Sequence, residues 1–255
     1  AVRSRGLGDV YKRQLQDHLD YLSVHNHSST DLIGMSLRSI FYTYPMELLK
    51  YIFKKTGLFT STVAEAGGFI RTSDELDVPD VQLHFAPAMV VDHGRTQLWG
   101  RGLSCHVCLL RPKSRGTVRL QSADSHDDPL IDPKFLSHPD DIKVLVKGYK
   151  KMMAIMRTGP ISQYIAKCVR PVNIHDDRDI ERAIRESADT VYHPVGTCKM
   201  GNDSHAVVDE RLRVHNMQNL RVVDASIMPT VVGGNTNAPT VMIGEKAAEM
   251  ILEDW

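Results

Sequence analysis

The sequence lacks any long apolar run, and no stretch approaches the roughly 20 uninterrupted apolar residues of a membrane-spanning helix. It also lacks a net charge, with 31 basic and 31 acidic residues, so charge predicts neither nucleic acid nor an anionic membrane as a partner. Four cysteines among 255 residues are too few for a disulfide scaffold and favour a reducing compartment. With 42% hydrophobic and 24% charged residues, the composition is that of an ordinary globular protein.

Metal ligands are also sparse. Cys105 and Cys108 form one C-x-x-C, but no second Cys or His pair follows at the spacing of a zinc site. The histidine pairs His25/His27 and His84/His93 lack the i,i+4 helical spacing and the acidic third ligand of a metal hydrolase. We therefore predict no metal site.

The pattern of apolar residues predicts an α+β fold, with several strands in the middle of the chain and helices around them. Period-3.6 spacing predicts helices at 46–53, 139–156, 177–188 and 239–252, with Gly57 as the C-cap of the first. Strands are expected at 81–91, 103–110, 116–120 and 220–223, and the pair Gly67-Gly68 marks a bulge or a close backbone approach. The methionines of 139–156 are expected to fill the core.

Residues 1–14 differ in pattern from the rest of the chain. They hold four basic residues, one acidic residue and no clear period. The Gly6-Leu7-Gly8 within them has neither a third glycine nor an apolar strand before it, so it is not a dinucleotide-binding loop. We expect this segment to be a leader that is not native to the protein.

The segment Val191–Gly201, VYHPVGTCKMG, carries the first candidate site residue. Pro194 fixes its own backbone and restricts that of His193. An imidazole on such a stiff segment, with an ordinary pKa of about 6.5, can act as a general base near neutral pH. A hydrogen-bonded core histidine is the alternative that the residues alone leave open.

The segment Arg221–Glu245 predicts a strand that ends at Asp224, a turn through Gly233-Gly234, and a helix with Pro239 near its first position. The unpaired N–H groups at such a helix start can stabilise a phosphate or an anionic ring. Asn235 and Asn237, just ahead of it, can each donate and accept hydrogen bonds. A purely structural strand–loop–helix is the alternative.

Together the two segments resemble the C-terminal signature of the glucose–methanol–choline (GMC) oxidoreductase family. The likeness extends upstream: LQDH at Leu15–His18 resembles the family's flavin-proximal segment, and RPKSRGTVRLQSADSHDDPLIDPKFL resembles the start of its C-terminal substrate region. The nearest branch is that of bacterial FAD-dependent alcohol and choline dehydrogenases. The resemblance covers Leu15 to the end, and it implies an antiparallel-sheet substrate domain with flanking helices, plus a strand–loop–helix that returns to an incomplete FAD-binding α/β domain.

The resemblance also implies roles for particular residues. His193 matches the family's catalytic base, and Asn237 matches its second active-site position. Asp224 and Ala225 match residues that contact the diphosphate region of FAD. The remaining implied cofactor contacts are Pro194 beside the flavin, Asn235 ahead of the last helix, and Ala238, Pro239 and Thr240 at the pyrimidine end of the isoalloxazine.

The implied reaction is the FAD-dependent oxidation of a small primary alcohol, choline-like or other, to an aldehyde. His193 takes the hydroxyl proton, the carbon transfers hydride to flavin N5, and Asn237 holds the oxygen. A quinone or another carrier is the expected electron acceptor, and His84 and Phe85 are expected near the substrate. The expected location is the cytoplasm, or the periphery of a membrane.

From Leu15 onward no strand–GxGxxG–helix unit for the adenosine part of FAD occurs. We therefore expect a fragment, with its FAD-binding N-terminal domain missing, divided into a leader 1–14, a substrate-binding domain 15–190 and an active-site and FAD-domain segment 191–255. The alternative function is a non-catalytic, truncated module that only binds a ligand or partner.

Overall fold

The computed structural model describes residues 14–29, 33–96 and 98–254, so most of the expected leader lies outside the described residues. The chain forms two compact units, each built from separate stretches of sequence. One, which we call the sheet unit, comprises residues 20–108 and 144–188. The other, the motif unit, comprises residues 14–19, 109–143 and 189–254 and therefore contains both signature segments. The boundaries predicted at residues 14 and 190 stay predictions.

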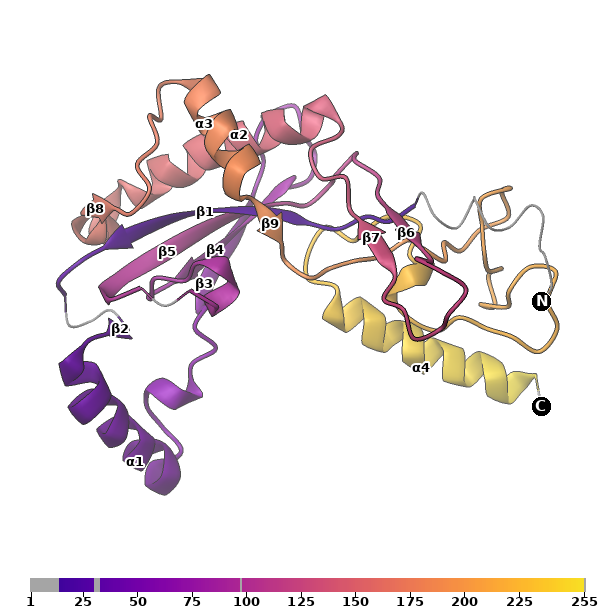
Figure 1. The fold of residues 1–255 in the computed structure, drawn as a ribbon, viewed down its shortest axis with the longest axis horizontal. Helices are drawn as coiled ribbons and strands as arrows, with labels where there is room; N and C mark the ends of the chain where they lie inside the picture. The colour runs from indigo at the N-terminus through magenta and orange to yellow at the C-terminus, as the bar shows by residue number, and fades with distance from the viewer. Residues whose placement is uncertain (1–13, 30–32, 97, 255) are drawn as a thin grey trace. The chain divides into compact units, whose positions relative to one another are not determined.

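The sheet unit is organised by an antiparallel sheet in the order β3-β4-β5-β1-β8, with the short β2 paired to β5 (Figure 1). The strands are β1 (Leu19–Asn26), β2 (Gly34–Met35), β3 (Ala66–Ile70), β4 (Val81–Ala86), β5 (Gly100–Leu109) and β8 (Lys167–Cys168). Gly67 in β3 lies opposite His84, and a Cβ atom on it would lie 2.4 Å from the Leu83 carbonyl oxygen. The close backbone approach predicted at this glycine is therefore confirmed.

Helices α2 (Pro139–Met156) and α3 (Asp177–Ser187) lie beside this sheet (Figure 1). The methionines Met152, Met153 and Met156 of α2 are at most 4% exposed, which confirms them as core residues. A Cβ atom on Gly148 of α2 would lie 2.8 Å from the Val107 side chain of β5, so this glycine allows the helix to pack closely against the sheet. The α+β class and the bounds predicted for α2 are confirmed.

Helix α1 (Tyr44–Lys54) extends beyond the predicted helix 46–53 at both ends and has a different C-cap. Its C-cap is Lys55, in the left-handed conformation, and Gly57 instead precedes a short 3₁₀ helix, Leu58–Thr60. The glycine C-cap prediction was therefore wrong. The helix has no buried residue, and apolar side chains such as Leu49 and Phe53 are 47% and 78% exposed.

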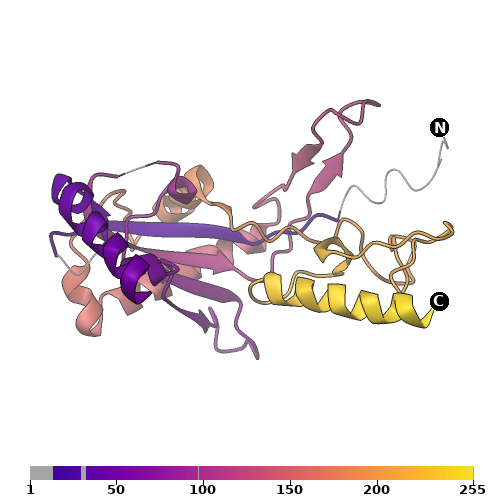
Figure 2. The ribbon, with the colours of Figure 1, turned by 90° about the horizontal axis from the view of Figure 1, so that it is seen from below.

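The motif unit is mostly irregular backbone around a compact apolar core. Its regular elements are the pair β6 (Thr117–Arg119) and β7 (Leu130–Asp132), the short β9 (Asp189–Thr190), and helix α4 (Asn237–Glu253). Figure 2 shows the β6–β7 hairpin extending away from α4. The core is made of apolar residues from both signature segments and the loop between them: Val195, Val207, Val208, Leu212, Val214, Ile227, Met228, Val231, Ile243 and Ala247.

The strand predicted at 220–223 is wrong. Only an isolated bridge joins Arg221 to Arg213, and Leu220 and Val223 are 44% and 39% exposed. The apolar residues of this short run therefore do not form a buried strand in the described part of the chain.

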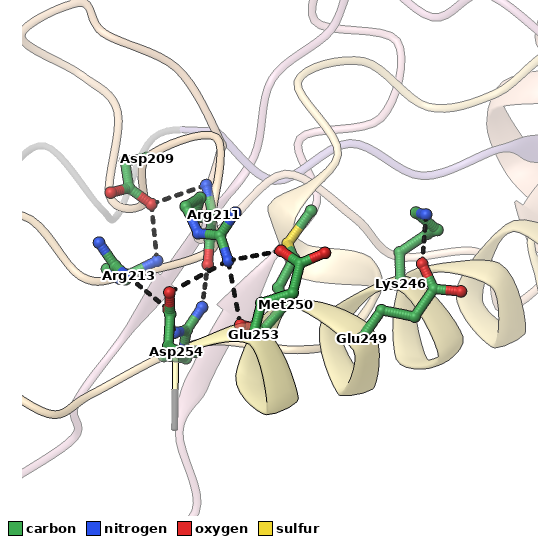
Figure 3. A network of polar contacts seen from close by, with 9 residues as sticks. Asp209, Arg211, Arg213, Lys246, Glu249, Met250, Glu253 and Asp254 are labelled. Carbon is green, nitrogen blue, oxygen red and sulfur yellow. Dashed lines mark hydrogen bonds and ion pairs between the residues drawn. The ribbon is translucent and has the colours of Figure 1, made fainter.

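The C-terminal end of α4 is held by a network of arginines and acids (Figure 3). Arg211 Nη2 donates to the Met250 carbonyl at 3.1 Å and to the Glu253 carboxylate at 3.0 Å. Asp254 accepts hydrogen bonds from Arg211, Arg213 and Arg221. The arginines fix the helix to the 209–221 loop, and cations at a helix C-terminus also complement its dipole.

Candidate active site

The LQDH segment, Leu15–His18, connects the two signature segments. Gln16 forms a two-way backbone bridge with Val195, at 3.0 and 2.8 Å. Its side chain is 4% exposed; Nε2 donates to the Pro229 carbonyl at 3.0 Å, and Oε1 accepts from the Val231 N–H at 3.2 Å. One buried glutamine therefore holds the segment after His193 next to the loop that leads to Asn237.

The two signature segments also bond directly to each other. The Cys198 N–H donates to the Ser226 carbonyl at 3.0 Å, and the Met200 N–H donates to the Ile227 carbonyl at 2.8 Å. Both acceptors belong to the 3₁₀ helix Ala225–Ile227, in which Ile227 is buried in the core. The structure therefore places both segments in one unit, side by side.

Asp17 fixes the backbone of His193. Its Oδ1 accepts the His193 N–H at 2.9 Å, and its Oδ2 accepts the hydroxyl of Thr190. Thr190 Oγ1 in turn accepts the N–H of Tyr192, which has a left-handed φ of 63°. Burial raises the pKa of Asp17, although its hydrogen bonds to Thr190 and His193 oppose the shift.

His193 is half-buried, and its ring meets the ring of His18. The two Nδ1 atoms are 2.9 Å apart, and the rings are nearly perpendicular, at 83°. His18 is 0% exposed, and its Nε2 lies 3.2 Å from the Leu110 carbonyl oxygen. The part of the chain that the structure describes offers no hydrogen-bond partner to His193 Nε2, so this nitrogen is open to a ligand.

Both histidines are kept neutral by their surroundings. Burial lowers the pKa of His18 to about 4, helped by the neighbouring His193 and, more weakly, by Arg111. The Leu110 and Val232 carbonyls oppose this shift. Burial also lowers the pKa of His193. A neutral imidazole with one free nitrogen can accept a proton, as a general base requires.

The last helix begins at Asn237, two residues earlier than predicted, so that Pro239 is its third residue. Its N-cap residue, Thr236, makes no side-chain capping bond. Asn237 and Ala238 are exposed, and the Asn237 carboxamide has no partner among the described residues. Pro239 has no N–H and the Thr240 N–H donates to the Thr236 carbonyl at 3.1 Å, so the N–H groups of Asn237 and Ala238 are the ones left for an anionic or hydrogen-bonding group.

The other predicted flavin contacts have varied settings. Asp224 is exposed, and its carboxylate caps the 3₁₀ helix by accepting the Ser226 N–H at 2.7 Å. Ala225, its neighbour, is half-buried; Pro194 and Asn235 are exposed; Pro239 and Thr240 are half-buried. The helix start, the Asn237 carboxamide and the His193 Nε2 each carry a donor or acceptor of the kind that an isoalloxazine ring or an alcohol hydroxyl can bond.

Sequence reasoning gave no role of its own to Gln16, Asp17 or His18. The signal was the three consecutive polar residues, QDH, between Leu15 and Leu19. Polar residues that are buried must find partners, and these find them in both signature segments. By contrast, Cys105 and Cys108 are buried in or beside the sheet, and burial raises the pKa of Cys105 to about 12. In the sheet unit, His84 and Phe85 are half-buried in β4.

The comparisons with known proteins identify the family. The family model described as GMC oxidoreductase matches residues 112–244, slightly more than half of the chain, so the chain belongs to the GMC oxidoreductases. This is a family of FAD-dependent enzymes, as the resemblance implied. The match includes Val191–Gly201 and all but the last residue of Arg221–Glu245.

Individual relatives agree with this assignment. The chain is 47% identical over 241 residues to an alcohol dehydrogenase (acceptor) of Pseudomonas putida, covering 94% of the chain and 44% of the relative. It is 39% identical over 239 residues to an oxygen-dependent choline dehydrogenase of Escherichia coli, covering 93% of the chain and 42% of the relative. The chain thus spans less than half the length of these relatives.

Solved structures share the fold. A formate oxidase of Aspergillus oryzae superposes with a TM-score of 0.86 at 23% identity, over 97% of this chain and 48% of that one. A pyridoxine 4-oxidase superposes with a TM-score of 0.74 at 24% identity, over 95% of this chain and 43% of the oxidase chain. None of the described helices is both long and apolar enough to cross a membrane.

Proposed function

We propose that this chain supplies the catalytic base and the substrate side of an FAD-dependent dehydrogenase that oxidises a small primary alcohol to an aldehyde. The observation that carries the proposal is the unpartnered Nε2 of His193, on a neutral imidazole whose Nδ1 contacts His18 and whose backbone N–H is bound by Asp17. The alcohol and choline dehydrogenase names of the relatives support the substrate class.

Each residue has a distinct role in the proposed mechanism. His193 Nε2 accepts the hydroxyl proton as the alcohol carbon loses hydride, so that the departing hydride leaves a carbonyl. Asn237 donates a hydrogen bond to the same oxygen and fixes its distance from the imidazole. The first turn of α4 would stabilise negative charge at the pyrimidine end of a bound flavin.

When bound, FAD would supply the hydride acceptor at N5. Asn235, Ala238, Pro239 and Thr240 at the start of α4, with Pro194 next to His193, would hold the isoalloxazine. Asp224 and Ala225 would approach the diphosphate, and the adenosine part requires a dinucleotide-binding unit outside Leu15–Trp255.

The test uses the complete flavoprotein that contains this chain. Purified protein is mixed anaerobically with a panel of primary alcohols, and bleaching of the flavin absorbance is followed. We expect rapid bleaching in wild type and a rate lower by roughly 10²–10⁴-fold in His193→Ala. The matched control is His126→Ala, since His126 is an exposed histidine in the β6–β7 loop. No bleaching by any alcohol in wild type would reject the substrate class.

The electron acceptor and the location are further parts of the proposal. A quinone or another carrier, rather than oxygen, is proposed as acceptor; the name of the Pseudomonas putida relative leaves its acceptor unspecified, and the Escherichia coli relative is named oxygen-dependent. We place the protein in the cytoplasm, with peripheral attachment to a membrane as the alternative; the exposed apolar side chains of α1 beside Lys50 and Lys54 would suit such attachment. Oxygen uptake compared with quinone reduction, and cell fractionation, test the two points.

A further inference from the structure

The histidine pair in the motif unit has a fixed direction of hydrogen bonding, and this direction follows from the groups around it. His18 is buried completely and its Nε2 faces the Leu110 carbonyl oxygen, which can only accept a hydrogen bond. A neutral imidazole carries one N–H, so His18 must place it on Nε2. Its Nδ1 therefore has a lone pair and can only accept.

His193 must then be the donor in the contact between the two Nδ1 atoms, which are 2.9 Å apart. The opposite assignment would leave two lone pairs facing each other at His18 Nε2 and the Leu110 oxygen, 3.2 Å apart and shielded from water. With its single proton on Nδ1, neutral His193 has an unprotonated Nε2, the nitrogen without a partner among the described residues.

We propose that His18 is a positioning residue that selects the tautomer of His193, holding its proton on Nδ1 and leaving Nε2 to accept the alcohol proton. This inference rests on the proposed function for the identity of the proton donor. The arrangement resembles the orienting acid behind the histidine of a catalytic triad, with a neutral imidazole in place of the carboxylate.

The pair also accommodates the product of proton transfer. Once the alcohol proton is on Nε2, His193 carries an N–H on each nitrogen and one positive charge. Its Nδ1–H continues to donate to His18, which needs no proton movement of its own. Two other charged groups face the pair. Asp17 accepts a hydrogen bond from the backbone N–H of His193, and the positive charge of Arg111 disfavours a positive charge on His18.

The direct test reads the tautomer in the resting holoenzyme. The complete flavoprotein is labelled with ¹⁵N-histidine, and long-range ¹H–¹⁵N spectra of wild type and His193→Ala are compared to identify the His193 signals. We expect an N–H on Nδ1 and a pyridine-type shift for Nε2. A protonated Nε2 with an unprotonated Nδ1 would overturn the proposal, and this result needs no His18 variant to fold.

Two His18 variants test the consequence for catalysis. His18→Asn places an amide oxygen near the position of Nδ1 and keeps an acceptor, whereas His18→Leu has none. We expect His18→Leu to lower the limiting rate of flavin reduction between about tenfold and about 10⁴-fold, the latter being the cost of a wrong tautomer in a triad. The acid limb of the pH–rate profile of His18→Leu should move to lower pH. Without the Nδ1 acceptor of His18, the imidazolium of His193 is less stable, which lowers the pKa of His193. His18→Asn should recover most of both effects.

The outcomes separate this inference from the proposed function. Equal rates and equal pH profiles for His18→Leu and wild type would reject the positioning role even if His193→Ala is inactive. If the tautomer is as expected but His193→Ala reduces the flavin normally, His18 still selects the tautomer of His193, and His193 is rejected as the base.

Discussion

The carboxylate of Asp17 has two opposing effects on stability, and two substitutions separate them. It accepts hydrogen bonds from the His193 N–H and the Thr190 hydroxyl, yet it is only 9% exposed and burial raises its pKa. A carboxyl with a raised folded-state pKa binds more protons folded than unfolded. Stability is therefore lost as the pH rises from the ordinary value of 3.8 through the folded-state pKa.

Asp17→Ala removes both acceptors, and each donor left in a buried place costs about 1–3 kcal/mol. Because Thr190 and His193 are only half-buried and can regain water, we expect a total loss of about 1–3 kcal/mol in the free energy of unfolding. Asp17→Asn keeps an oxygen for the His193 N–H and an amide for the Thr190 hydroxyl, without a buried charge. It should be as stable as wild type at pH 7, or more stable.

The assay is urea unfolding of the complete protein at pH 7, with anaerobic flavin reduction measured on the same preparations. Asp17→Ala should also slow flavin reduction, because a shift of about 1 Å in the base can cost 10²-fold. An Asp17→Ala protein within about 0.5 kcal/mol of wild type would refute the reasoning, as would an Asp17→Asn protein less stable than Asp17→Ala.

Three further predictions concern other parts of the chain. Gly196→Ala should lower the melting temperature, because φ is +89° and a Cβ atom would lie 2.6 Å from the Gln14 carbonyl oxygen; an unchanged melting temperature would contradict this. Asp254→Asn should be less stable than wild type at neutral pH, because Arg213, then Arg221, lower the pKa of Asp254 to about 2. The melting temperatures of wild type and Asp254→Asn should therefore converge as the pH falls from 3.8 towards 2. A difference in melting temperature that persists at pH 2 would exclude this cause. Met152→Ala should cost about 2–5 kcal/mol in urea unfolding, since Met152 is 0% exposed, and a loss below about 1 kcal/mol would mean that its site collapses or is not core.

The elements that the sequence predicts well are those with a regular apolar period. Helix α2 has apolar residues every three or four positions with acids in its first turn, and its bounds match the prediction. Strand β1 was missed because Asp20, Ser23 and His25 are buried within it, which hides the pattern of a central strand. Their side chains find partners inside the fold: Ser23 Oγ lies 2.9 Å from His25 Nε2 within β1, and Asp20 Oδ2 lies 2.5 Å from His106 Nδ1 of β5.

The candidate site also contains residues that the sequence indicates and contacts that it does not. His193 and Asn237 lie in long motifs that resemble a known family, so the sequence points to them directly. The contact between His18 and His193 joins residues 175 positions apart, and no local pattern encodes it. The Leu110 carbonyl that orients His18 belongs to the backbone, so its identity as Leu carries no signal.

The proposed mechanism depends most on His193 as the acceptor of the alcohol proton. The most direct measurement is the limiting rate of anaerobic flavin reduction in His193→Ala, with and without added imidazole. We predict a loss of roughly 10²–10⁴-fold that imidazole partly restores, because a free imidazole can occupy the vacated space and take the proton. A rate within a few-fold of wild type, or a loss that imidazole leaves unchanged while bound flavin is intact, would contradict the mechanism.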